Sequence, residues 1–242
     1  MNLVEKRQSF CYNKEEYLVN RLKQSLIIYT ILSAWLKERK KRMKMIVYMI
    51  FGYLLGCINP SYIISHIKGF DIRDEGTGNA GTTNTMLVMG KRMAALVLIF
   101  DITKTIIAVK VAVIMFPDSL YAGDIAGVMC VVGHIFPFNM KFRGGKGVAC
   151  FGGLILALSS EFFIPLLLLG LIAAVLINYG CVVPIIASAV YPILYWIKTG
   201  SILSALIISI VSVIIIYKHI DNIKKIKNGN EIHFNNLWKK TA

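Results

Sequence analysis

Glycine-rich loops hold most of the residues in this chain whose types and spacing could do chemistry. The first loop, residues 71–84 (DIRDEGTGNAGTTN), interleaves short hydroxyl and amide side chains with glycines immediately before a helix. Glycine permits backbone conformations in which successive N–H groups converge on an anion, and a helix N-terminus adds partial positive charge. The pattern predicts a phosphate-binding loop, although a tight interfacial loop capped by Thr and Asn would carry the same residues. The candidate ligands are Thr77, Gly78, Asn79, Thr83 and Asn84.

The second loop, residues 143–147 (RGGKG), places two cations among three glycines. A lysine beside exposed backbone amides is a suitable phosphate clamp. The loop lacks the spacing and the Ser/Thr of the nucleotide-binding type, so we do not expect an ATP site. A basic anchor on a turn is the alternative interpretation. The candidate residues are Arg143, Gly144, Gly145, Lys146 and Gly147.

Two further pairs of polar residues lie at or inside apolar stretches. Asp101 and Lys104 are three residues apart, so they share a helix face and can pair with each other. Charges within a membrane are costly and usually face a partner or a water-filled cavity. Two interpretations therefore stay open: a purely structural ion pair, or a role for Lys104 in the site. His219 and Asn222 share a face where the last apolar stretch ends, and a histidine there could accept a proton or bind phosphate.

The sequence shows none of several familiar catalytic patterns. It has no Ser-His-Asp order, no His-x-x-x-x-Asp acyltransferase signature and no paired catalytic carboxylates. Its five cysteines are far apart and read as small buried hydrophobes, so we expect neither a metal nor a cofactor. The predicted site is therefore one that holds phosphate and excludes water without forming a covalent intermediate.

The elements that position these loops are membrane helices. Apolar residues make up 56% of the chain and charged residues 17%, too few to keep a soluble domain of this size wet. An all-α, polytopic membrane protein of about seven transmembrane helices is expected. Glycines at 52 and 56 favour close helix contact, and Pro60 predicts a kink near the end of the first span. The predicted spans are 45–66, 93–116, 121–136, 148–158, 162–177, 182–197 and 202–217.

Charge sets the expected orientation. With seven crossings, the loops after the first and third spans and the C-terminal tail face one side, and these segments are rich in Lys and Arg. The positive-inside rule makes that side cytoplasmic. The net charge of +14 is then explained by helix orientation and anionic lipid headgroups, not by nucleic acid.

Residues 1–44 do not fit this pattern, because they would lie outside yet end in the basic run 37–42 (KERKKR). Residues 22–36 could lie along the membrane or form an extra span, or translation could begin at Met43 or Met45. The segment lacks the cleavage site of a secretory signal. We expect 1–44 to be an extension outside the catalytic fold, and 45–242 to be the membrane enzyme domain with its basic tail.

Taken in order, these motifs resemble the bacterial PlsY-type family of acyl-phosphate:glycerol-3-phosphate acyltransferases, over roughly residues 46–231. The matching segments are 71–73, 76–79, 81–84, 90–91, Asp101, Lys104, 133–137, 142–149, His219, 222–223, Gly229 and Glu231.

The resemblance implies transfer of an acyl group from acyl phosphate to the 1-position of glycerol 3-phosphate, giving lysophosphatidic acid and phosphate in phospholipid synthesis. It implies a multi-pass protein of the bacterial plasma membrane, expected to be a monomer. The carried-over catalytic residues are His219, Lys104 and Asn222. The carried-over binding residues are Thr77, Gly78, Asn79, Thr83, Asn84, Arg143, Gly144, Gly145, Lys146, Gly147 and Glu231. Either His219 or the phosphate of the substrate would take the proton of the acceptor hydroxyl.

The chain departs from the family pattern at four positions. Thr77 stands where the family usually has Ser, and Leu87 stands where it commonly has Arg. Asn178 and Cys181 stand where the family tends to have Arg and Ser. Two missing cations keep two alternatives open: a divergent paralogue acting on another polyol phosphate, or a non-catalytic protein that binds or transports lipid phosphates.

Overall fold

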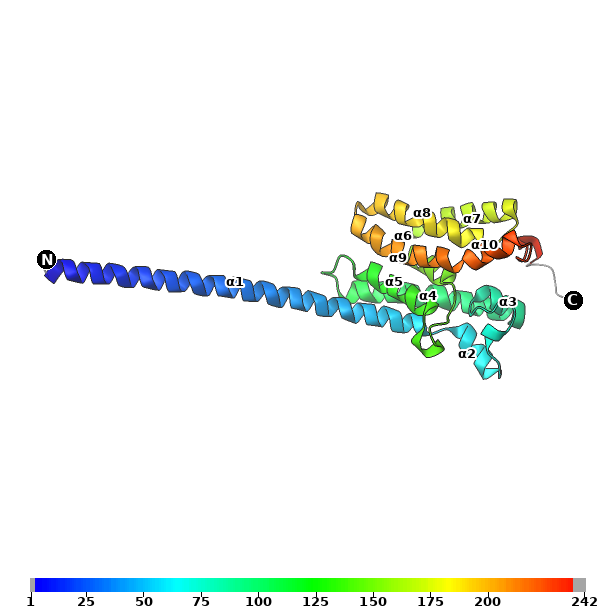
Figure 1. Ribbon diagram of the computed structural model, residues 1–242, viewed down its shortest axis with the longest axis horizontal. Coiled ribbons are helices and arrows are strands. Elements are labelled where there is room, and N and C mark those ends of the chain that lie inside the picture. Colours follow the sequence, from blue (N-terminus) through cyan, green and yellow to red (C-terminus); the bar gives the residue numbers. More distant parts are fainter. Residues whose placement is uncertain (1–2, 237–242) are drawn as a thin grey trace. The chain divides into compact units, whose positions relative to one another are not determined.

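The computed structural model describes residues 3–236, and all of its regular structure there is helical apart from one antiparallel bridge between Tyr179 and His233 (Figure 1). It forms two compact units, residues up to Ile46 and residues from Val47 onward. Helix α1 spans Leu3–Cys57; its residues up to Ile46 belong to the first unit and those from Val47 to the second. In the first unit, the hydroxyls of Ser25 and Thr30 donate to carbonyls one turn earlier, at 2.9 and 2.8 Å.

The second unit is a helical bundle. Its helices after α1 are α2 (Pro60–Ile67), α3 (Thr82–Met89), α4 (Lys91–Met115), α5 (Ala122–Ile135), α6 (Val148–Ser159), α7 (Phe163–Ile177), α8 (Val182–Thr199), α9 (Ile202–Lys218) and α10 (Ile220–Lys227). The bounds of α4 to α9 agree with the predicted spans within two residues. One expectation needs correction: the segment between the predicted spans 45–66 and 93–116 is not a loop throughout, because α3 forms inside it. The first glycine-rich loop leads into this short helix.

Two groups of helices make up the bundle (Figure 1). Helix α4 packs against α3, α5 and α6, while α8 packs against α7 and α9, and α5 joins the groups by contacting α9. The main core lies between α5, α6, α8 and α9, with Leu154, Tyr191, Ile208 and Ile215 fully buried. Helix α7 leaves most of its apolar side chains exposed, as expected for a helix that faces lipid.

Several helical runs within residues 3–236 could cross a membrane by length and composition. They are Ala122–Met140, Val148–Ile177, Val182–Thr199 and Ile202–Lys227, with the bent pair Arg21–Cys57 and Pro60–Ile67 as a fifth. The run 148–177 is divided by a 3₁₀ turn at Ser160–Phe162. Helix α4 has the length, but charged residues between Lys91 and Lys110 interrupt its apolar sequence. The count of seven crossings remains a prediction.

The end of α1 confirms two expectations: that glycines 52 and 56 permit close helix contact, and that the chain bends near Pro60. A Cβ on Gly52 or Gly56 would strike the carbonyl of Ala126 or Cys130 on α5, so these glycines permit close helix packing. The helix then breaks at Ile58, and the Asn59 side chain caps α2 by accepting from the Tyr62 N–H at 3.1 Å. The break carries the chain from the bundle into the first glycine-rich loop.

Candidate active site

Buried Asn84 shapes the first glycine-rich loop. Its Oδ1 accepts from the Thr77 N–H at 2.7 Å, and its Nδ2 donates to the carbonyls of Ile72 and Glu75 at 2.8 and 3.0 Å. The neighbouring glycines at 76 and 78 have φ of +57° and +73°, a region that favours glycine. Because the amide of Asn84 bonds to the loop backbone, this residue supports the loop from beneath, while Thr77 and Asn79 face outward into the site.

Arg73 ties the two glycine-rich loops together. Its guanidinium pairs with the Asp71 carboxylate at 2.6 Å and donates to the carbonyls of Met140 and Arg143 at 2.8 and 3.2 Å. The hydrogen bond from Arg73 holds the pKa of Asp71 below its ordinary value. From the other side, the Asn59 amide donates to the Ala80 carbonyl at 3.0 Å. These cross-links make a rigid frame from segments far apart in the sequence.

The glycines of the second loop cap a helix, which corrects one expectation. The N–H groups of Gly144 and Gly145 donate to the carbonyls of Ile135 and His134, both at 3.1 Å, at the C-terminal end of α5. Neither amide is therefore free to bind phosphate here. A Cβ on Gly145 would strike the His134 ring and lie 2.9 Å from the Ala80 carbonyl, so glycine is needed there for close packing.

A cavity of about 430 Å³ gathers part of the predicted site. Eight of the predicted residues line it: Thr77, Asn79, Thr83, Lys146, Gly147, His219, Asn222 and Glu231. Six others lie outside its lining: Gly78, Asn84, Lys104, Arg143, Gly144 and Gly145. The cavity thus brings together one residue set from each of the two loops and a third from the tail.

Three of these side chains form a hydrogen-bonded row. The ammonium of Lys146 donates to Oδ1 of Asn222, and Nδ2 of Asn222 donates to Oε1 of Glu231 at 2.6 Å. An ammonium only donates and a carboxylate only accepts, so the two partners fix the orientation of the Asn222 amide. Burial lowers the pKa of Lys146 from its ordinary value, while the charge of Glu231 opposes this shift.

His219 lines the cavity, and within residues 3–236 its Nε2 makes no hydrogen bond. It is 4% exposed, and its Nδ1 lies 2.8 Å from the Ile215 carbonyl one turn earlier. Because a carbonyl can only accept, Nδ1 carries the proton and Nε2 keeps a lone pair when the ring is neutral. The neutral imidazole is therefore set up to accept a proton from a group in the cavity.

Two helices, α3 and α6, begin at the cavity. Thr82 and Thr83 begin α3, and Val148 and Ala149 begin α6, and all four residues line the cavity. The first-turn N–H groups of a helix lack partners within the helix, and the helix dipole favours negative charge at that end. This end of the cavity can therefore hold an anion with backbone donors.

Lys104 does not line the cavity, because its ammonium lies in the bundle. It donates to the carbonyls of Gly56 and Ile58 at the break after α1, at 3.2 and 2.7 Å. It also pairs with Asp101 at 2.7 Å and lies 3.1 Å from Nδ1 of His134. Lys104 is thus a structural cation that joins the broken helix to α4 and α5.

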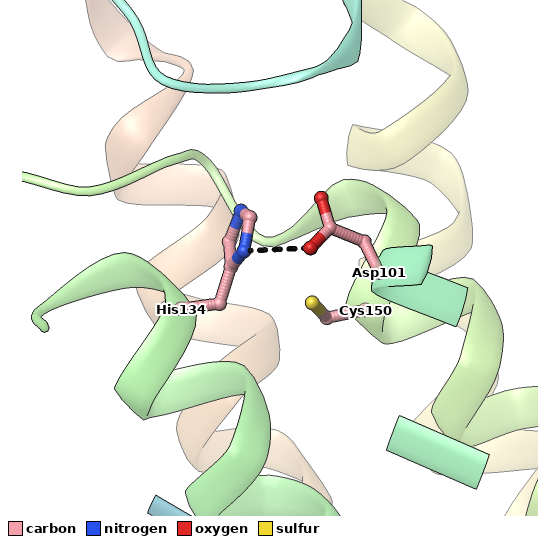
Figure 2. Close-up of side chains that lie close together, drawn as sticks. All are labelled: Asp101, His134 and Cys150. Carbon is pink, nitrogen blue, oxygen red and sulfur yellow. Dashed lines mark ion pairs between the residues drawn. The ribbon is translucent and has the colours of Figure 1, made fainter. Parts of the chain in front are cut away.

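Asp101, His134 and Cys150 lie close together beside this ammonium (Figure 2). One ligand-type atom from each lies within 4.8 Å of the others, a grouping that can hold a metal ion. The Lys104 ammonium contacts two of the three groups, so a cation of the chain itself already balances the carboxylate. We therefore read the cluster as an internal ion pair network.

The rest of the cavity is an apolar arm between helices. Its lining includes Leu98, Ile102, Phe151, Ile155, Phe163, Leu166, Val183 and Ala187, from α4, α6, α7 and α8. One end of the cavity is therefore rich in hydrogen-bond donors and the other is hydrocarbon. A ligand with a phosphorylated head and an alkyl tail matches both ends.

Several residues that line the cavity had no role in the sequence-based site. Thr82 has a buried hydroxyl with no hydrogen-bond partner within residues 3–236. In the sequence, only its position next to the candidate Thr83 could have pointed to it. Asp101 and His134 reach the cavity because α4 and α5 meet beneath it. Ile232 and Phe234 close it from the tail, which sequence could not show because the tail folds back over 178–181.

The departure at Asn178 has a structural role. Asn178 ends α7 with φ of +64°, a conformation that Asn tolerates. Its carbonyl accepts from the Phe234 N–H at 2.7 Å, and its Oδ1 accepts from the Asn235 N–H at 3.1 Å. Leu87, the other position without the expected cation, lies on α3 outside the cavity lining.

The family described as glycerol-3-phosphate acyltransferase matches residues 46–229. The chain belongs to this family. A glycerol-3-phosphate acyltransferase of Brucella anthropi is 36% identical over 184 residues, which cover 76% of this chain and 90% of the relative. One from Clostridioides difficile is 37% identical over 194 residues, covering 77% and 93%. Most of the residues that line the cavity lie within the matched range.

Solved structures of this family have the same fold. The glycerol 3-phosphate form of PlsY, an integral membrane glycerol 3-phosphate acyltransferase, superposes with a TM-score of 0.74 at 30% identity, covering 80% of this chain and 96% of that one. Its lysophosphatidic acid form gives 0.71 at 28% identity, covering 80% and 97%. The chain is therefore an all-helical, multi-pass membrane protein of the acyltransferase family.

Proposed function

We propose that this protein transfers an acyl group from acyl phosphate to the 1-hydroxyl of glycerol 3-phosphate. The observation that carries the proposal is the cavity itself, which joins a donor-rich end at two helix N-termini to a hydrocarbon arm. The donor and the acceptor each carry a phosphoryl group, and the donor also carries an alkyl chain. Both substrates thus have the chemistry that this cavity offers.

Lys146 and the backbone at the starts of α3 and α6 neutralise the phosphoryl charge. Asn222 holds the ammonium of Lys146 in place, and Glu231 fixes the Asn222 amide. Thr77, Asn79, Thr82 and Thr83 add directional hydrogen bonds from the first loop. Preorganised donors of this kind stabilise charge that develops on the leaving phosphate, where they act in a partly water-excluded site.

The reaction needs alignment and one proton transfer. The 1-hydroxyl oxygen forms a bond to the acyl carbon, and the bond from that carbon to the phosphate oxygen breaks. Nε2 of His219 accepts the hydroxyl proton, which then passes to the departing phosphate, so the imidazole returns to its neutral form. A mixed anhydride carries a good leaving group, and holding both substrates in register supplies much of the rate.

We also propose where the enzyme works and which part of the chain is needed. The glycine-rich loops and the tail face the cytoplasm at a bacterial plasma membrane, and the chain acts as a monomer. The catalytic domain is the part from residue 45 onward, and residues 1–44 are an extension. Removing residues 1–44 is expected to leave turnover intact, and cysteine labelling should place positions 79, 146 and 219 on one side of the bilayer.

The deciding experiment is turnover by the purified protein. Supplied with acyl phosphate and glycerol 3-phosphate, it should release lysophosphatidic acid and inorganic phosphate in equal amounts. Lys146→Ala should lower kcat/KM by about 10- to 100-fold, because a hydrogen bond to a charged group is lost. Lys224→Ala, on the exposed face of α10, is the matched control and should retain activity. Saturable binding by a folded protein without any product would favour a binding or transport protein instead.

A further inference from the structure

The carboxylate of Asp101 is buried, yet it borders the cavity. Its residue is 1% exposed, and Oδ1 is held by the Lys104 ammonium at 2.7 Å and by Nδ1 of His134 at 3.3 Å. These contacts at Oδ1 are ion pairs without hydrogen-bond geometry, and within residues 3–236 neither they nor any hydrogen bond engages Oδ2. Figure 2 shows this second oxygen pointing away from both the imidazole and the Cys150 thiol. One oxygen is thus anchored, and the other is left to accept a hydrogen bond.

Anchoring keeps this carboxylate in one orientation. Lys104 is itself fixed by the carbonyls of Gly56 and Ile58, and His134 lies against Gly145 of the second loop. The ammonium balances the charge of the carboxylate, so an ionised Asp101 is tolerated in the bundle. The direction in which Oδ2 accepts is therefore set by three helices rather than by a mobile side chain.

The polar lining of the cavity is otherwise suited to phosphate. Hydroxyls, an ammonium and first-turn N–H groups all donate, whereas Asp101 and Glu231 are the two carboxylates of the lining. Glu231 already accepts from Asn222. An acceptor with two hydroxyls needs two acceptor groups, because a buried hydroxyl without one is costly. His219 takes the hydroxyl that reacts. Asp101 is then the carboxylate of the lining whose second oxygen can accept from the other hydroxyl, and a charged acceptor forms a stronger hydrogen bond than the hydroxyl and amide oxygens nearby.

We propose that Oδ2 of Asp101 accepts a hydrogen bond from the 2-hydroxyl of the acceptor substrate and so selects a polyol phosphate with a free hydroxyl next to the reacting one. The inference rests on the proposed function. Lys104 and His134 are positioning residues for this contact. No proton is transferred to Asp101, and the bond serves to turn the 1-hydroxyl toward the acyl carbon.

The test compares three acceptors with the full-length protein. Glycerol 3-phosphate has the 2-hydroxyl, 3-hydroxypropyl phosphate lacks it, and dihydroxyacetone phosphate has a carbonyl in its place. The wild type should use the last two with kcat/KM lower by about 10- to 100-fold, because a site built for a hydroxyl rejects analogues that leave its buried acceptor unpaired. In Asp101→Asn, the amide can donate to the carbonyl, so the preference for glycerol 3-phosphate over dihydroxyacetone phosphate should fall at least 10-fold.

The outcomes separate the contact from a structural effect. Cys150→Ser, in the same cluster, should keep the wild-type ratios. Equal losses on all three acceptors in Asp101→Asn would make Asp101 a structural residue and overturn the inference. If Asp101→Asn does not fold, the wild-type comparison stands alone, and equal use of the three acceptors refutes the contact. No product from any acceptor would refute the acyltransferase function, and the inference with it.

Discussion

The charge around Lys146 should control how activity falls in alkaline solution. In the proposed function Lys146 binds phosphate as an ammonium, and burial holds its pKa below the ordinary value for lysine. Activity is therefore expected to fall as pH rises through this pKa. The carboxylate of Glu231 raises the pKa and the ammonium of Lys225 lowers it. Removing either charge should move the alkaline limb of kcat/KM, in opposite directions.

Glu231→Gln is the sharper of the two changes. The Gln oxygen can still accept from Asn222, so the row of hydrogen bonds survives while one negative charge is lost. The Asn222 amide separates the Glu231 carboxylate from the Lys146 ammonium, and in a partly solvated site their attraction is worth roughly 1 kcal/mol, which corresponds to about 0.7 units in the pKa of Lys146. The alkaline limb should move that far toward lower pH. Lys225→Gln removes a repulsive charge on an exposed side chain and should move the limb upward, by about 0.3 units.

The assay is the pH dependence of kcat/KM for glycerol 3-phosphate at saturating acyl phosphate, because this parameter reports groups of the enzyme form that binds glycerol 3-phosphate. Asp221→Asn is the matched control. The Asp221 carboxylate also raises the pKa of Lys146, but less than Glu231 does, and its side chain is 84% exposed. Its shift should therefore be smaller than that of Glu231→Gln. Limbs that stay in place, or that move in the same direction in both variants, would refute the role given to Lys146.

Three other changes test the frame of the site. Gly145→Ala should lower activity and Tm, with a loss of about 1–3 kcal/mol in the free energy of unfolding, because the added methyl meets the His134 ring and the Ala80 carbonyl. Gly69→Ala is the control: Gly69 has φ of +84° and open space around it, so thermal melting should show a loss of only about 1 kcal/mol. Lys104→Met should destabilise the protein by about 3–5 kcal/mol by leaving Asp101 uncompensated, and adding Asp101→Asn should recover part of the loss in the same melting experiment. Ala187→Phe narrows the apolar arm and should shift the preferred acyl phosphate toward shorter chains, measured by kcat/KM across a chain-length series.

The helices of the bundle could be predicted because apolar runs and breaking residues mark them directly. Pro60 marks the predicted kink within the first span, and the segment 117–121 separates α4 from α5 where the sequence indicates. Helix α3 could not be predicted in this way, because it has only eight residues and lies within a polar, glycine-rich segment. Short helices of this kind are stable only in tertiary contact, here through Asn84 and Thr85, which are both fully buried.

The candidate site was predicted in part, and the difference lies in what a residue type can reveal. Lys146, His219 and Asn222 were recognisable because each lies in a motif at the end of an apolar run. The resemblance also implied a catalytic role for Lys104, whereas its ammonium bonds to two carbonyls at a helix break 46 residues or more earlier in the chain. Contacts over such sequence separations depend on how helices pack, which no local pattern records.

The starts of α3 and α6 at the cavity have a consequence for mutagenesis. Donors that belong to the main chain are present whatever side chain follows them, so replacing residues one by one with alanine leaves them in place. An alanine scan of this cavity would therefore underestimate how strongly it binds anions. Replacing single backbone amides by esters at 82–84 and 148–150 would remove those donors one at a time and measure their contribution to anion binding.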